Sequence, residues 1–574
     1  MKKIFIYLIV IQAFVLPRSL QAKTTWILQG VTYEVDTLRH YQVGPGTAFT
    51  VVDLNGPVKQ RVFYTVTDLT NPNVEIKAIC GNDELKASYT VPQMVANHAK
   101  DGNAYFAGVN SDLFSTLGPI GTTIVDGEIY KVAKTSTGWF QVGVDNNKNF
   151  YYGQPYTTYK LNSTPTGQMS PKGVNVARAS NDFIIYTSKF GTKTGTTAGA
   201  TGVEVGAVEM DGGLKANGVT KMKVVTAPQT NIGNMTIPEN GFVLSANASW
   251  YMTPLQNLSV GDVIEITPTF TLNSATITGL TQMSGGCPVI LSNGTIQNND
   301  GLLDHLTSRR PRTSIGTDAT GTKMVLLVVD GDAANKDVSA GCTSKDLAAM
   351  MLAVGCTNAL NFDGGGSSTM YTEPFGVENV PSEGGGGLRK VRSGWFVTTA
   401  DKGDTELKTI AFADYAKNLL INEEYAPVIY GYNDVGLLVN TNLADFTLSC
   451  ANPQCNISAD GKKIKFAQSG TYLLTATSGS MTAHVMVNLK NTSGISDVVF
   501  DDDCRLVHNI INRSESAQLV TTSDVDVKIF SINGECEAQI KCKGGGTHNL
   551  PTSTLASGVY LVKSGDKTAK LIIK

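Results

Sequence analysis

The chain has 574 residues, of which 41% are hydrophobic and 17% are charged, with 58 glycines and a formal net charge of −3. This nearly neutral balance gives no global basic field, which argues against non-specific binding of nucleic acid. At roughly 150 residues per domain, the length predicts about four units, and the composition suits a β-rich globular chain.

Residues 1–22 are predicted to be a secretory signal peptide. Lys2 and Lys3 precede an apolar run that is too short for a comfortable membrane span, and the segment ends at the small residue Ala22. No later segment has the pattern of a transmembrane helix. We therefore expect a secreted, periplasmic or cell-surface protein.

A buried strand is predicted at residues 324–329, where the sequence MVLLVV is bounded by turn signals. The strand ends at Asp330, which we consider both as a catalytic carboxylate and as a simple turn cap. Arg312 and Thr313 precede the strand. Because a guanidinium group matches phosphate oxygens in pairs, these two residues are predicted to bind phosphate.

A helix is predicted between Thr343 and Gly355. Thr343 is a suitable N-cap with Asp346 three residues later, apolar residues recur at helical spacing, and Gly355 is a suitable C-terminal stop. This helix would connect two buried strands as a crossover and place both strand ends at one sheet edge. We therefore expect an α+β catalytic domain with a mixed sheet.

The second of these strands, residues 358–362, ends at Asp363, which is followed by three glycines, two serines and a threonine. Glycines permit positive φ and close backbone approach, and the amides and hydroxyls of such a turn can bind an anion. A plain glycine-rich hairpin is the alternative. Asp363 is our first choice as catalytic carboxylate, and the turn is predicted to bind substrate or phosphate through Gly364, Gly365, Gly366, Ser367, Ser368 and Thr369.

The segments RTSIG at 312–316, VDG at 329–331 and NALNFDGGGSSTM at 358–370 resemble the phosphodiester glycosidase family. Weaker similarity runs in order through further segments, so that the resemblance covers about 106–395. Those segments are 106–114, 118–127, 202–205, 237–245 and 285–294. The resemblance implies a hydrolase acting on a sugar phosphodiester, with N-acetylglucosamine as the sugar in the animal member.

The resemblance also implies roles for two upstream residues. Glu204 lies in a segment that is similar to a family strand carrying a glutamate, and is a candidate catalytic partner of Asp363, although it could equally point to solvent from an edge strand. Asn110 would orient a sugar hydroxyl or the phosphate. Ser111 and Asp112 depart from the usual pair of glycines, so the surroundings of Asn110 are expected to be more polar than in relatives.

Two cleavage chemistries remain open at this point. Paired carboxylates would break the sugar carbon–oxygen bond, whereas phosphorus–oxygen cleavage usually recruits a metal or a strong cationic clamp. We favour the first, because carboxylates outnumber histidines in the matched segments. The sequence requires no cofactor and leaves a divalent cation open. The alternative function is a non-catalytic glycan-binding or envelope-structural protein on the same fold.

Nine cysteines are present. Cys450 and Cys455 are close enough to join across a hairpin, as are Cys536 and Cys542, and a further pair flanks the predicted helix. Spacing does not fix connectivity, and buried free thiols are an equal alternative.

Beyond the catalytic domain (23–399) and a polar linker (400–408), two small all-β modules are predicted. Residues 409–490 show short strands and turns spaced as in an immunoglobulin-like sandwich. Residues 491–574 resemble the sorting domain of the Bacteroidetes type IX secretion route, which implies contact with a secretion machinery.

Overall fold

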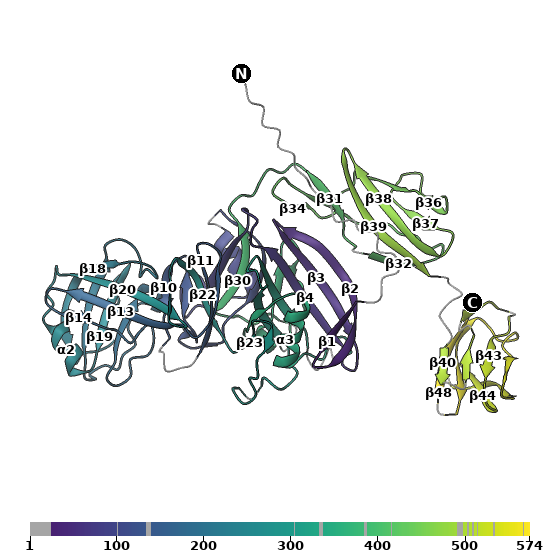
Figure 1. Ribbon diagram of the computed structural model, residues 1–574, viewed down its shortest axis with the longest axis horizontal. Helices are drawn as coiled ribbons and strands as arrows, with labels where there is room; N and C mark the ends of the chain where they lie inside the picture. The colour runs from purple at the N-terminus through teal and green to yellow at the C-terminus, as the bar shows by residue number, and fades with distance from the viewer. Residues whose placement is uncertain are drawn as a thin grey trace, which may run out of the picture. The chain divides into compact units, whose positions relative to one another are not determined.

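The computed structural model is dominated by β-structure (Figure 1). It describes residues 24–99, 102–133, 139–303, 305–331, 337–383, 387–414, 416–490, 498–501, 504–507, 510–513, 515–531, 534–565 and 567–574. The predicted signal peptide lies outside these residues.

The α+β prediction is wrong. Strands make up 51% of the structure and helices 6%, and the described residues contain three α-helices. These are α1 (Val91–His98), α2 (Ser249–Gln256) and α3 (Ser344–Ala353). One helical pattern between two buried strands led us to expect an α+β domain, whereas the apolar residues elsewhere follow the period of two that builds sheets.

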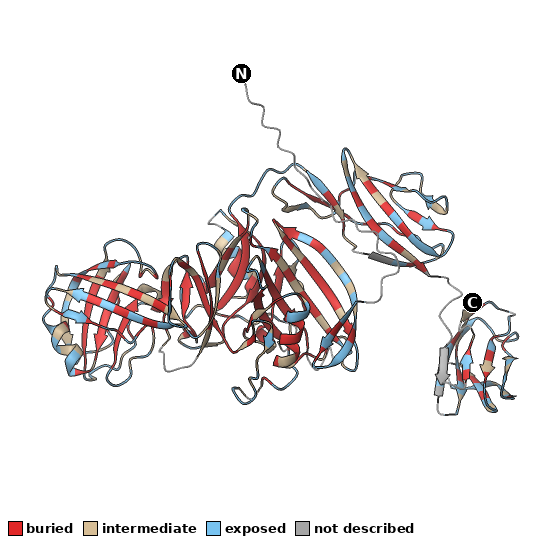
Figure 2. Ribbon diagram, viewed as in Figure 1, coloured by how far each residue is buried: buried red, intermediate tan, exposed pale blue. Residues whose placement is uncertain are grey.

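The chain forms two compact units. The first comprises Met1–Leu407 and Tyr432–Val439, and the second comprises Lys408–Gly431 and Asn440–Lys574. In both, buried and exposed residues alternate along many strands (Figure 2). No helix among the described residues is long and apolar enough to span a membrane.

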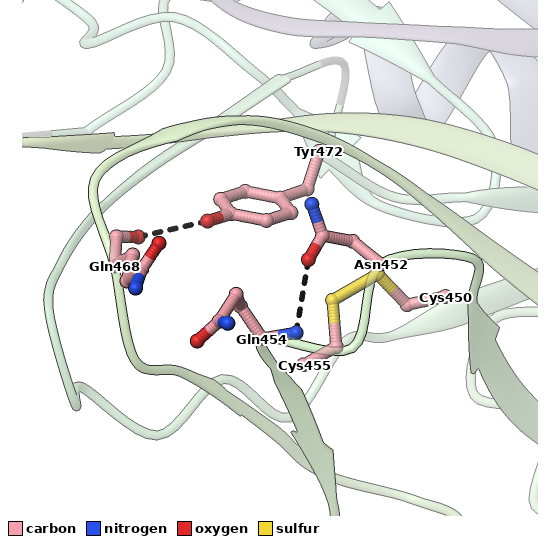
Figure 3. The surroundings of a disulfide bond; sticks show 6 residues. All are labelled: Cys450, Asn452, Gln454, Cys455, Gln468 and Tyr472. Carbon is pink, nitrogen blue, oxygen red and sulfur yellow. Dashed lines mark hydrogen bonds between the residues drawn. A yellow bond between two sulfur atoms is a disulfide. The ribbon is translucent and has the colours of Figure 1, made fainter.

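The second unit contains a four-stranded sheet followed by two C-terminal sheets. Its Cys450–Cys455 disulfide joins β35 (Thr447–Cys450) to β36 (Cys455–Ile457), which confirms that predicted pairing (Figure 3). Cys536 and Cys542 are free, as are the two cysteines that flank α3. The immunoglobulin-like and sorting-domain assignments stay predictions.

The first unit contains a nine-stranded sheet, in which every neighbouring pair is antiparallel. The mixed sheet that we expected is therefore absent from this part of the fold. The strand order is β1 (Thr25–Leu28), β2 (Val31–Gly44), β3 (Thr47–Asn55), β4 (Gln60–Asp68), β26 (Lys323–Val329), β25 (Arg312–Thr317), β27 (Asn358–Asn361), β23 (Val289–Ser292) and β24 (Thr295–Ile296).

The predicted strand–helix–strand crossover is confirmed within this sheet. The hydroxyl of Thr343 accepts from the amide of Asp346 at 3.1 Å, the carboxylate of Asp346 accepts from the amide of Thr343, and Gly355 adopts a φ of +97°. Helix α3 packs on β1 and β23. Since β26 and β27 are both antiparallel to β25, they run parallel to each other and end at one edge.

Two five-stranded sheets adjoin this edge. The first contains β29 (Gly376–Val377), β28 (Met370–Thr372), β6 (Ala104–Asn110), β30 (Ser393–Thr399) and β5 (Glu75–Cys80). The second contains β10 (Glu128–Lys131), β9 (Thr123–Val125), β22 (Leu280–Gly286), β11 (Phe140–Asp145) and β12 (Phe150–Gly153). A further nine-stranded sheet holds β17 (Val203–Glu209), whose apolar residues pack in a core shared with β9, β10 and β22.

Candidate active site

The turn from Asp363 to Thr369 connects β27 of the large sheet to β28 of a five-stranded sheet. Gly365 has a φ of +61°, which favours glycine. A Cβ atom at Gly364 would lie 2.7 Å from the carbonyl oxygen of Pro311, so no larger residue fits there without movement. The glycines therefore serve the tight turn and the close approach that the sequence predicted.

The turn's backbone amides are mostly used inside the protein. The amide of Gly365 donates to Pro311 O at 2.9 Å, Ser367 donates to Gly364 O, and Ser368 donates to Gly365 O. The amide of Thr369 donates to the side chain of Asn110 at 3.1 Å. An anion bound at this turn would thus depend more on the side-chain hydroxyls than on the amides, both of which we predicted to contribute.

Asn110 joins the two ends of the turn. Its Nδ2 donates to the carbonyl oxygen of Asp363 at 2.8 Å, while its Oδ1 accepts from the amide of Thr369 and from Thr313 Oγ1 at 2.9 Å. Asn110 and Thr313 are fully buried. Both predicted binding residues therefore lie beside Asp363, with their polar groups holding the turn in shape.

Asp363 is partly exposed at the start of the turn. Its amide donates to Ser111 O at 2.8 Å. Burial raises the pKa of its carboxyl group to about 6, against the lowering effects of the Ser367 hydroxyl, the Arg389 charge and the Gly364 amide.

A second carboxylate, Asp112, lies within electrostatic reach of Asp363. It is 1% exposed and accepts from Trp139 Nε1 at 3.0 Å and from the amide of Gly121 at 2.6 Å. Burial raises the pKa of Asp112 to about 7. The charge of Asp363 raises it further, whereas these two hydrogen bonds and the charge of Lys131 lower it.

The sequence reasoning named Asp112 only as a polar departure from relatives. Its surroundings come from two sheets: it follows β6 of one five-stranded sheet, and a Cβ atom at Gly285 of β22, in the other, would overlap its Oδ2 atom. The available signal was a carboxylate two residues beyond the end of a strand in a segment that resembles the family.

Arg312 does not point toward the turn's open side. It is 2% exposed, and its Nε donates to Cys342 O at 2.8 Å. Its Nη2 donates to the carbonyl oxygens of His305 at 2.8 Å, Ser308 at 2.9 Å and Leu306 at 3.2 Å. These contacts fasten a loop to the sheet, so the guanidinium group is not placed as the phosphate ligand that we predicted.

Asp330 shares the sheet edge with Asp363, as predicted, but its carboxylate is 1% exposed and has its own partners. It accepts from Asn379 Nδ2 at 3.2 Å and from the amide of Val380 at 3.1 Å. Asn379 in turn donates to Ser368 O at 3.1 Å and accepts from the amide of Met370. Asp330 thus supports the far end of the turn.

Glu204 belongs to a different cluster, in β17 of the other nine-stranded sheet. It is 1% exposed, which rules out the solvent-facing alternative, and it forms an ion pair with Arg178 at 3.8 Å. Its carboxylate also accepts hydrogen bonds from four donors: Thr194 Oγ1 (3.3 Å), Thr196 Oγ1 (2.9 Å), Met235 N (2.8 Å) and Ser245 Oγ (2.8 Å). The structure does not bring Glu204 to Asp363.

Arg389 is the arginine that does lie at the turn. Its Nε contacts Glu383 Oε2 at 2.6 Å, its Nη1 approaches Ser367 Oγ at 3.5 Å, and its charge acts on Asp363. The sequence reasoning missed both Arg389 and Glu383, because neither lies in a strand or helix pattern. Among the described residues, no group of three or more histidine, cysteine or acidic side chains is arranged to hold a metal ion.

Comparison with solved structures gives matches of low identity. A protein from Synechocystis has a TM-score of 0.49 at 15% identity, covering 62% of each chain. A protein from Burkholderia pseudomallei has the same TM-score at 17% identity, covering 66% of this chain and 99% of that one. The catalytic domain of zebrafish N-acetylglucosamine-1-phosphodiester alpha-N-acetylglucosaminidase, auto-inhibited by its pro-peptide, has a TM-score of 0.32 at 13% identity, covering 64% and 88%.

Sequence comparison is more local. A prophage-derived protein of Bacillus subtilis, YomE, is 37% identical over 75 residues, which span 13% of this chain and only 11% of that relative's length. The phosphodiester glycosidase family model matches residues 215–398. This range contains Asp363, its turn and Arg389 but begins after Asn110 and Asp112. Residues 215–398 of the first unit are therefore similar to the phosphodiester glycosidase family.

Proposed function

We propose that the protein hydrolyses the bond between a sugar and the phosphate of a sugar phosphodiester or related anionic glycan. One observation carries the proposal: the amide of Asp363 donates to Ser111 O at 2.8 Å, which places Asp363 beside Asp112, inside a unit that contains the family match. The family match supports hydrolysis of a sugar phosphodiester, and the geometry of the two carboxyl groups supports their separate roles.

The two carboxyl groups are suited to different roles. Asp363 is partly exposed, so it is the group that would contact substrate, and with a pKa of about 6 it is mostly ionised at neutral pH. Asp112 keeps its proton to higher pH, because it is more deeply buried and faces the charge of Asp363. A carboxylate beside a carboxylic acid is the pairing that glycosidases use.

In this proposal Asp363 acts on the anomeric centre, either as nucleophile or through an activated water molecule. Asp112 acts as a positioning residue, since its oxygens are held by Trp139 and Gly121. Trp139 is itself partly exposed, and its indole ring provides an aromatic surface next to the carboxylate pair. Aromatic faces of this kind suit the apolar side of a sugar ring.

The test is hydrolysis of methyl N-acetyl-α-glucosaminyl phosphate in ¹⁸O-labelled water. We expect the label in the released sugar, which marks carbon–oxygen cleavage, and a fall in kcat of about 10²- to 10⁴-fold in Asp363→Asn. Asp300→Asn is the control, because Asp300 forms an exposed ion pair with Lys345.

Three outcomes would count against this proposal. Label in the phosphate would replace it with phosphorus–oxygen cleavage. Unchanged kcat in Asp363→Asn would remove Asp363 from the chemistry. Binding of the diester without any turnover would favour the glycan-binding alternative.

We also propose that the protein acts outside the cytoplasm. The proposal rests on the sequence of residues 1–22. Amino-terminal sequencing of the mature protein should begin near Lys23, and an intact Met1 on protein from the producing cells would contradict export.

A further inference from the structure

We propose that Arg389 binds the substrate phosphate and that Glu383 occupies the same position in the free protein, so that substrate binding exchanges a carboxylate for a phosphate. This inference rests on the proposed function and names the group that recognises the anionic half of its substrate. It begins from the turn, whose amides are largely used by the protein itself.

The guanidinium group of Arg389 lies directly on the turn. A Cβ atom at Gly366 would lie 2.6 Å from Arg389 Nη2 and would overlap Glu383 Oε2. The absence of a side chain at Gly366 therefore lets Arg389 and Glu383 contact the backbone of the turn. Ser367, which is fully buried, approaches Arg389 Nη1 and also interacts with the carboxylate of Asp363.

These contacts describe a site for an anionic oxygen. Glu383 Oε2 accepts from Arg389 Nε at 2.6 Å, a distance typical of a charge-assisted hydrogen bond. The hydroxyl group of Ser368, next in the turn, is buried and has no hydrogen-bond partner. Since the charge of Arg389 acts on Asp363, an anion at this position would lie beside the proposed catalytic carboxylate.

The exchange is physically accessible because the internal pair is partly solvated. The side chains of Arg389 and Glu383 are 40% and 37% exposed, and an ion pair of that exposure contributes little net stability. A phosphate diester presents two oxygens to the planar guanidinium group and can accept two parallel hydrogen bonds from it. Glu383 can turn away by a change of side-chain rotamer, which leaves Arg389 with a single anionic partner throughout.

The contrast with Arg312 supports this assignment. Arg312 is buried and donates to four backbone carbonyl oxygens, so binding phosphate would break contacts that hold a loop. Arg389 would lose only an exposed carboxylate. Glu383 would also select against weak anions, because any ligand must compete with it.

The test measures binding of inorganic phosphate and of N-acetylglucosamine 1-phosphate by isothermal titration calorimetry at constant ionic strength. We expect Arg389→Ala to raise the dissociation constant by about tenfold or more, and Arg389→Lys to recover little, because an ammonium group lacks the fork. We expect Glu383→Gln to lower the dissociation constant about threefold or more, because the amide no longer competes as an anion.

Asp300→Asn is the matched control for Glu383→Gln. It removes one negative charge from a second ion pair of 2.6 Å with similar exposure, and we expect wild-type phosphate binding. Wild-type affinity in Arg389→Ala would overturn the role of Arg389. Weaker binding in Glu383→Gln would overturn the exchange, since Glu383 would then be positioning Arg389.

The binding assay needs no turnover, so the two proposals can fail separately. If phosphate binding changes as expected while no diester is hydrolysed, the proposed function fails and the anion site stands. If hydrolysis occurs with Arg389→Ala at an unchanged KM, the anion site fails and the hydrolase stands.

Discussion

Two buried carboxylates of the first unit, Glu204 and Asp112, have equal exposure but unequal surroundings. Glu204 has an arginine and four hydrogen-bond donors around its two oxygens. Asp112 has two donors and a neighbouring carboxylate, Asp363. A fully partnered buried charge stabilises one conformation, whereas an under-partnered carboxyl group keeps its proton to higher pH. Burial alone therefore did not distinguish a carboxylate paired within the fold from one whose pKa lies near neutrality.

The largest effect is expected when the cluster around Glu204 loses its arginine. Arg178→Ala leaves Glu204 buried without its cation, and we expect the free energy of unfolding of the first unit to fall by about 3–5 kcal/mol. Urea unfolding followed by circular dichroism measures the loss. Glu265→Gln, at an exposed pair with Lys221, should change stability by less than about 1 kcal/mol. Equal losses in both variants would show that the cluster is not the source.

The second prediction concerns how the free energy of unfolding depends on pH, through the carboxyl group of Asp112. Because the pKa of Asp112 is raised on folding to about 7, the native state binds a proton that the unfolded state has already released above its ordinary value of 3.8. Stability should therefore fall as pH rises from about 4 to about 7, by on the order of 4 kcal/mol at about 1.4 kcal/mol per pKa unit.

Asp112→Asn removes this titrating group, so its stability should vary less over the same window. The remaining slope should include Asp363, whose pKa is raised in the same direction. Urea midpoints measured at intervals from pH 4 to pH 8 give the comparison. A variant with the wild-type slope would show that Asp112 is ionised throughout the range.

The smallest expected effect concerns Arg312. Arg312→Ala removes a charged donor from four backbone carbonyl oxygens, three of which keep a backbone donor, and we expect a loss of about 2–3 kcal/mol in unfolding free energy. The KM of the proposed reaction should stay close to wild type at a temperature where the variant is folded. Arg310→Ala is the control, because Arg310 is exposed and its side chain contacts Ser308. A large rise in KM without loss of stability would restore the phosphate role of Arg312.

Local features were predictable from the sequence. The N-cap of α3, its glycine stop and the glycine-rich turn depend on residues within a few positions of one another, and the structure has each of them. The fold class was not predictable in the same way, because one strand–helix–strand segment says little about sheets built from strands hundreds of residues apart.

The candidate site was predicted only in part, because some of its contacts depend on local motifs and others on contacts between distant segments. Asp363, Asn110 and Thr313 meet as the motifs suggested. The direction of the Arg312 side chain depends on a loop that no short pattern specifies, and Asp112 gains its importance only where two five-stranded sheets meet. Arg389 follows a run of glycines and leucine, where no periodicity marks it.

The bonds that close the active-site turn also connect distant parts of the polypeptide. Asn110 contacts Asp363 across 253 residues of chain and Thr369 across 259. Contacts of such long range require most of the chain to be ordered first, because closing a long loop costs conformational entropy. The turn should therefore complete its bonds late in folding and lose them early in unfolding. The proposed hydrolase activity would then be lost before most of the β-structure, which makes it a sensitive probe of partial unfolding.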